Sequence, residues 1–211
     1  DNLNANKIAD FEKGQYHGGI FTKEKDLEQV HNLIGFESLS YLDDDYYKCQ
    51  ILASILGGGM SSRLFQEVRE ERGLAYSIYA FNLSNADSGL FGIYCGTDPK
   101  KSNDMLKVVR DEVCKITQNI TEKELQRSIS QIKAGLLMGQ ESSHSRCQRL
   151  GADVLARNRI VSHAEIIEKI SDISVIDICN LANRIFFNKN SKSTFAALGK
   201  IKGNDVFSEF L

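Results

Sequence analysis

The sequence predicts an α+β domain in which an antiparallel sheet of about five to six strands carries helices on one face. Alternating apolar residues predict strands in the first half of the chain, and apolar residues at helical spacing dominate the second half. The 211 residues, 42% of them hydrophobic and 26% charged, are enough to bury a core. The expected order places a helical block before a last strand.

Two strands are predicted at the start of the domain, over residues 19–22 and 27–36. Alternate side chains of the second strand share one apolar face, which indicates burial on one side. An extended peptide can add itself to an exposed sheet edge through main-chain hydrogen bonds. The 27–36 strand is a candidate for such an edge, although no single residues are assigned to the role.

Two helices are predicted next along the chain. The acidic run 43–45 opens the first helix, because carboxylates favour the positive end of the helix dipole, and the helix ends at Gly57. Ser61 or Ser62 caps the second helix, which runs to about Glu71.

A strand pair, a helical block and a final strand complete the predicted order. The two strands cover 74–83 and 89–96 and are joined by a turn. Helices follow from apolar spacing and from a capping box, Thr121-x-x-Glu124. The remaining segments, in order, are helices over 105–116 and 121–136, helices near 143–157, 163–171 and 175–187, and a strand over 194–198.

Charge and cysteine content restrict the partners and the compartment. A net charge of −2 provides no basic excess for nucleic acid or anionic lipid, and no apolar run approaches the roughly 20 residues of a membrane span. Five widely spaced cysteines, an odd number without a C-x-x-C pair, indicate a reducing compartment and hence a cytoplasmic location.

The most informative segment extends from Leu56 to Ser77. It begins with Gly57-Gly58-Gly59, continues into a charged helix and ends in a strand that carries a tyrosine. The glycines do not form a P-loop, because no lysine followed by serine or threonine stands at the required place. From the residues alone, the triple glycine is a helix stop joined to a helix start.

The segment from Leu56 to Ser77 resembles the C-terminal half of the pitrilysin and mitochondrial-processing-peptidase family of zinc peptidases, especially the bacterial processing proteases. Weaker likeness lies in 87–94 and 131–138. In that family the first half carries an H-x-x-E-H zinc motif, and the second half closes over the substrate. The resemblance implies that residues 18–211 form this C-terminal domain and that residues 1–17 are a linker or tail from a missing N-terminal half.

The resemblance also implies a site. Arg69 and Tyr76 correspond to the arginine and tyrosine that hold the peptide backbone and stabilise the tetrahedral oxyanion. The loop Gly57-Gly58-Gly59 borders the substrate chamber in relatives. Without the resemblance, Arg69 would be expected to pair with nearby glutamates on a solvated helix and Tyr76 to pack between strands.

Other charged residues of the segment leave alternatives open. Arg72 replaces Arg69 as the substrate contact if the helix register differs by one turn, and Arg63 anchors the loop or pairs with a carboxylate. The acidic residues of this helix attract basic peptides or form an ordinary solvated face. They are Glu67, Glu70 and Glu71.

The histidines predict no metal site in this chain. His17, His31 and His144 lack acidic residues at the spacing of the zinc motif. His163 and Glu165 form an H-x-E pattern, but no P-C-x-x-C follows, and Ser162 with Glu165 is better interpreted as a helix cap. Zinc is therefore expected only in the intact enzyme, bound by the missing N-terminal half.

The sequence thus predicts the substrate-binding, chamber-closing C-terminal domain of a zinc endopeptidase that cleaves peptides or presequence-like extensions. Alone it is expected to be inactive. Its expected partners are a peptide substrate, the metal-binding half or a partner subunit, and a second copy in a homodimer. The alternatives are a non-catalytic scaffold or partner subunit of the same family and a free-standing peptide-binding domain.

Overall fold

A five-stranded sheet with one layer of helices forms the structure, a computed structural model that describes residues 14–188 and 193–201. The strand order is β1-β5-β2-β4-β3. The strands are β1 (Gly19–Glu24), β2 (Val30–Ser38), β3 (Ser77–Ser84), β4 (Gly89–Thr97) and β5 (Thr194–Gly199).

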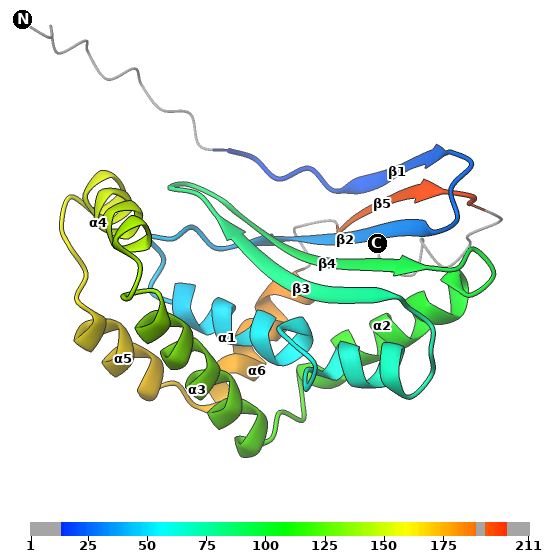
Figure 1. Ribbon diagram of the computed structural model, residues 1–211. Helices are drawn as coiled ribbons and strands as arrows, with labels where there is room; N and C mark the ends of the chain where they lie inside the picture. Colours follow the sequence, from blue (N-terminus) through cyan, green and yellow to red (C-terminus); the bar gives the residue numbers. More distant parts are fainter. Residues whose placement is uncertain (1–13, 189–192, 202–211) are drawn as a thin grey trace, which may run out of the picture.

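The helices cover one face of this sheet and leave the other face open (Figure 1). The α+β class, the strand number and the one-sided helix layer are as predicted. Pairing is antiparallel except between β1 and β5, which are parallel. The helical elements are α1 (Tyr46–Gly57), η1 (Phe65–Glu70), α2 (Ser102–Ile116), α3 (Glu122–Met138), α4 (Ser143–Arg157), α5 (His163–Ser171) and α6 (Val175–Phe186).

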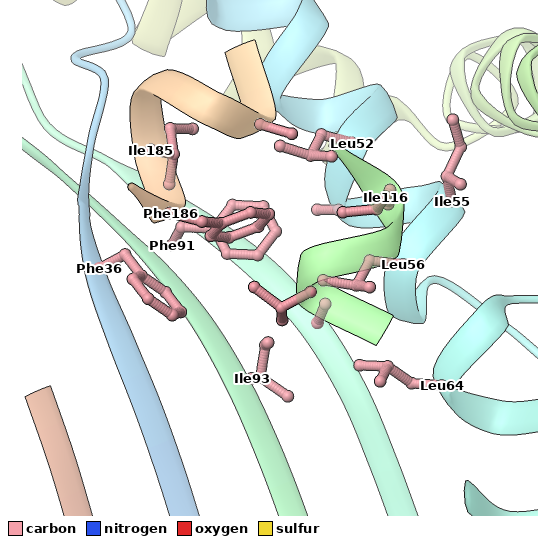
Figure 2. Close-up of a cluster of buried hydrophobic side chains, with 14 of the residues drawn as sticks. Phe36, Leu52, Ile55, Leu56, Leu64, Phe91, Ile93, Ile116, Ile185 and Phe186 are labelled. Atoms are coloured by element: carbon pink, nitrogen blue, oxygen red, sulfur yellow. The ribbon is translucent and has the colours of Figure 1, made fainter. Parts of the chain in front are cut away.

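The core lies between the sheet and the helices. Figure 2 shows Phe91 of β4 and Phe36 of β2 meeting Phe186 of α6, and both contacts are edge-to-face, with ring centroids 5.2 and 5.0 Å from Phe186. Leu52 and Leu56 bring α1 into the same cluster. Because aromatic rings bury large areas, this cluster holds the helix layer against the sheet.

The expectation that the 27–36 strand provides an exposed edge is wrong. β2 begins at Val30 and lies between β5 and β4, so its main chain is paired on both sides. The alternation of Val30, Asn32, Ile34 and Phe36 reports burial of one face against the helices, and it carries no information about strand order. The outermost strands are β1 and β3.

The second predicted helix differs in form and in its cap. η1 is a π-helix, in which Glu71 N–H donates to Gln66 O at 2.9 Å, five residues back. Neither predicted serine caps it: the Ser62 hydroxyl donates to Gly59 O at 2.6 Å, across the glycine loop. The π-helix therefore begins at Phe65, later than the start that a cap at Ser61 or Ser62 predicted. By contrast, the Thr121–Glu124 capping box of α3 is confirmed.

The N-terminal boundary of the domain stays a prediction. Residues 1–13 of the predicted 1–17 linker lie outside the described residues, whereas Tyr16 lies against the sheet. Its hydroxyl donates to Gly35 O at 2.9 Å and is 2.6 Å from Thr194 Oγ1.

The end of α1 packs on the main chain of β3 through a glycine. Gly57 is buried, and a Cβ atom placed on it would lie 2.2 Å from Ala80 N and 2.8 Å from Tyr79 C. Only a residue without a side chain permits this approach. The predicted helix end at Gly57 is thus confirmed, and its cause is tertiary contact as well as helix termination.

We expect Gly57→Ala to lower the free energy of unfolding by about 2 kcal/mol, because the added methyl group must displace backbone atoms. Urea denaturation measures the change. Gly59→Ala is the matched control: its Cβ would meet only the Gln131 amide at 3.6 Å, an ordinary contact, and should change stability by less than about 0.5 kcal/mol. Equal effects of the two changes would contradict the packing explanation.

Candidate functional site

The candidate site lies where η1 passes into β3. Gly73 adopts φ 57°, a left-handed conformation that glycine accepts without strain, and the chain turns there. Gly73 N–H donates to Arg69 O at 3.1 Å, and Leu74 N–H donates to Val68 O at 2.8 Å. These bonds tie the end of the helix to the start of the strand and thereby fix Arg69 and Tyr76 on one compact unit.

Tyr76 lies directly before β3, which begins at Ser77. Its N–H donates to Gly96 O at 2.9 Å, and Gly96 is also the register partner of Ser77. This bond holds the main chain of Tyr76 at the start of the strand. The Tyr76 side chain is 60% exposed.

Arg69 has weak contacts within its own helix. Its guanidinium carbon lies 4.7 Å from the centre of the Phe65 ring, and its Nε is 3.9 Å from Glu70 Oε1, beyond hydrogen-bond range. In the described part of the chain, the Arg69 guanidinium makes no hydrogen bond. Arg69 and Tyr76 are both exposed donors available to a ligand.

The other two arginines of the segment are engaged. Arg63 donates to Glu124 from Nε at 2.6 Å and from Nη2 at 2.9 Å, and it also binds Asn119. It thereby anchors the glycine loop to the start of α3. Arg72 donates to the Glu67 carboxylate and, at 2.8 Å, to Glu67 O.

The Arg63 contact changes the acidity of its partner. Burial alone would raise the pKa of Glu124, but the hydrogen bonds from Arg63 and Thr121 overcome it and lower the pKa from 4.5 to about 2. Glu124 therefore stays ionised under nearly all conditions.

The glycine loop is shaped by packing. Gly58 could not carry a side chain, because a Cβ would lie 2.5 Å from Ser54 Cα, whereas Gly59 has room. The Gln131 amide of α3 donates to Gly58 O at 3.1 Å. None of the three glycines has a positive φ, so the requirement for glycine at Gly57 and Gly58 is steric rather than conformational, whereas Gly59 has no such requirement.

The sequence prediction missed an aromatic group on the open face of the sheet. Tyr79 stacks on Tyr94 with ring centroids 4.9 Å apart, and the Phe81 ring follows at 6.0 Å from Tyr79. His31 Nδ1 lies 2.7 Å from the Tyr94 hydroxyl. The signal was present in β3, where Tyr79, Phe81 and Leu83 alternate with Ile78 and Ala80, which are buried under the helices. The strand therefore carries apolar side chains on both faces, a near-continuous apolar run rather than the alternation with polar residues that is typical of a strand with one solvated face.

The described residues do not fit a zinc site. Across residues 14–188 and 193–201, no group of three or more His, Cys, Asp or Glu side chains could hold a metal ion. His31 is engaged by Tyr94, and the five cysteines are unpaired thiols. Burial raises the pKa of the Cys49 thiol to about 12, which keeps it protonated and a poor ligand.

Comparison with known proteins identifies the family. Residues 2–132 match the family described as "Peptidase M16 inactive domain". The chain belongs to this family. An "Uncharacterized zinc protease" of Rickettsia felis is 38% identical over 198 residues, which cover 93% of the chain and 47% of that relative. The chain thus spans about half the length of the curated relatives it matches.

Solved structures share the fold. The M16 inactive domain from Pseudomonas fluorescens superposes with a TM-score of 0.81 at 24% identity, over 94% of this chain and 47% of that one. A chain of Complex III2 from Candida albicans has the same TM-score at 19% identity, over 92% of this chain and 49% of that one. These likenesses show the fold alone. Within the described part of this M16 domain, no helix is long and apolar enough to cross a membrane.

We expect Glu124→Gln to lower the free energy of unfolding by about 1 to 2 kcal/mol at pH 7, since it removes a partly solvated charged pair. Because the pKa of Glu124 is lowered in the folded protein, the ionised carboxylate stabilises the fold at pH values above 4.5, its ordinary pKa. This stabilisation decreases below pH 4.5 and is lost as the pH falls through about 2, the pKa in the folded protein. The difference between the two proteins in urea titrations should therefore shrink over that range.

Glu165→Gln is the matched control for this prediction. Hydrogen bonding to Arg159 also lowers the pKa of Glu165 to about 2, but that pair is exposed and joins neighbouring segments. A smaller effect is expected there, and a Glu124→Gln difference that persists unchanged at the lowest pH would contradict the electrostatic origin.

Proposed function

We propose that this M16 domain binds the substrate backbone and closes the peptide chamber of a zinc endopeptidase whose metal is held by another half. The substrates are peptides or presequence-like extensions. The observation that carries the proposal is the availability of Arg69 and Tyr76. Both are exposed and without a hydrogen bond from their side chains among the described residues, whereas Arg63 and Arg72 are engaged.

The two side chains suit the transition state of peptide-bond hydrolysis. The guanidinium is a permanently charged, planar donor, and the phenol donates one directional hydrogen bond from a rigid ring. Together they hold the substrate carbonyl and stabilise the negative oxygen that develops upon it. Arg69 is favoured over Arg72, because the Glu67 carboxylate and carbonyl already occupy the Arg72 guanidinium.

The remaining half is the proposed partner. Relatives about twice as long as this chain include proteins named zinc proteases, and the described residues contain no metal-binding cluster. The open sheet face, with Tyr79 and Leu83 exposed, is the proposed chamber wall. The glycine loop beside β3 would border the same chamber. Self-association into a homodimer through this face is part of the proposal.

A cytoplasmic location is also proposed. All five cysteines are free thiols, which is the state that a reducing compartment maintains.

A second candidate is a non-catalytic scaffold. The fold it shares with a chain of Complex III2 from Candida albicans favours this candidate, but only at the level of fold. An H-x-x-E-H motif in the sequence of the partner half would favour the peptidase.

We expect Arg69→Ala and Tyr76→Phe each to lower kcat/KM on a peptide substrate by about a hundredfold, because each removes one donor to the developing oxyanion. The measurement uses the protein joined to its zinc-binding half. Arg72→Ala is the control and should have a much smaller effect. Unchanged kcat/KM for both Arg69→Ala and Tyr76→Phe would remove the proposed roles.

A further inference from the structure

Phe65 is a large aromatic side chain that the hydrophobic core does not use. Its neighbours Leu64 and Val68 are fully buried, and Figure 2 shows Leu64 within the core cluster. Phe65 is half-buried, and among the described residues it belongs neither to this core nor to the partly buried side chains packed against it. Leu64 and Val68 therefore anchor η1 to the core, and the Phe65 ring contributes little to that anchoring.

The Arg69 guanidinium lies over the Phe65 ring. Its central carbon is 4.7 Å from the ring centre, a distance within the range at which the face of a ring attracts a cation. Both residues lie in η1, four positions apart, and side chains at this spacing are neighbours on the surface of a helix. The ring and the charge are thus brought together by the local structure of one short segment.

Arg69 is held differently from the two other arginines of this segment. Carboxylates hold Arg63 and Arg72, and each of these contacts uses N–H donors of the guanidinium. The face of a ring instead attracts the positive charge without accepting the hydrogen bonds that the guanidinium edge directs outward. Among the residues that the structure describes, Arg69 has no hydrogen-bond acceptor, since its Nε remains 3.9 Å from Glu70 Oε1. Arg69 is therefore held in place with its donors free.

We propose that Phe65 is the positioning residue of Arg69: the ring holds the charged group in place and leaves its N–H donors to the substrate carbonyl. The inference rests on the proposed role of Arg69 in substrate binding and adds a second residue to that role. An exposed arginine otherwise occupies many rotamers, and ordering it when substrate binds costs free energy. The ring lowers this cost in advance. Phe65 acts through Arg69 and is not itself a catalytic residue.

The test is a double-mutant cycle in the protein joined to its zinc-binding half. Phe65→Leu keeps an apolar side chain but removes the ring face, and it should lower kcat/KM on a peptide substrate about three- to fivefold. In the Arg69→Ala background the same change should have no further effect, because no guanidinium is left to position. Phe65→Tyr keeps the ring and should retain kcat/KM within about twofold of the parent.

The ring contact itself is measured in the chain alone, by NMR of the Arg69 Nε–H group. Because the face of an aromatic ring shifts nearby proton resonances upfield, the Arg69 Hε resonance should move downfield in Phe65→Leu and stay near its parent position in Phe65→Tyr. Phe187→Leu is the matched control. Phe187 is an exposed phenylalanine at the end of α6, and no cation lies over its ring among the described residues. This change should alter neither the resonance nor kcat/KM.

Three outcomes would overturn the inference: unchanged kcat/KM in Phe65→Leu, an equal loss in the presence and absence of Arg69, or an Arg69 resonance that does not respond to removal of the ring. An equal loss in both backgrounds would show that Phe65 only supports the fold, and it would leave the proposed role of Arg69 intact. Failure of the proposed function gives a different result, in which Arg69→Ala and Tyr76→Phe both retain the parent kcat/KM and the positioning role is rejected with it.

Discussion

The close packing of α1 beneath β3 is the contact on which the rest of the structure depends. Gly57 brings the helix against the peptide bond between Tyr79 and Ala80, and any side chain there would collide with main-chain atoms. This approach places the glycine loop beside β3. It also leads the chain into η1, which must then return through Gly73 to begin the strand. One steric requirement thus positions the loop and the candidate site.

Charge pairing separates the arginines of this segment into two kinds. Arg63 donates hydrogen bonds to Glu124, 61 residues away in the sequence, and stabilises the junction of the glycine loop with α3. Arg72 is held by Glu67 in its own helix, while Arg69 keeps only a ring contact and a distant carboxylate. Local sequence could not rank the three, because each has glutamates within one turn. Long-range geometry decides which guanidinium is available.

The elements whose signals are local were predicted well. The end of α1 at Gly57, the Thr121–Glu124 box and the last strand follow from glycine, capping and alternation, which act over a few residues. The serine cap and the edge position of the 27–36 strand were wrong. In the first case Ser62 bonds across a loop instead of along a helix, and in the second the neighbours of a strand depend on segments far along the chain.

By itself, the sequence determined the α+β class, the family, and Arg69 and Tyr76 as candidate site residues. It could do so because the spacing of apolar residues and the distinctive segment from Leu56 to Ser77 both depend only on residues that are close together along the chain. Only the tertiary structure decided the strand order, the main-chain bond that holds Tyr76 at the start of β3 and the aromatic group around Tyr94. These features arise from pairing between strands, and pairing energy depends on which distant main-chain groups meet rather than on the pattern within any one strand.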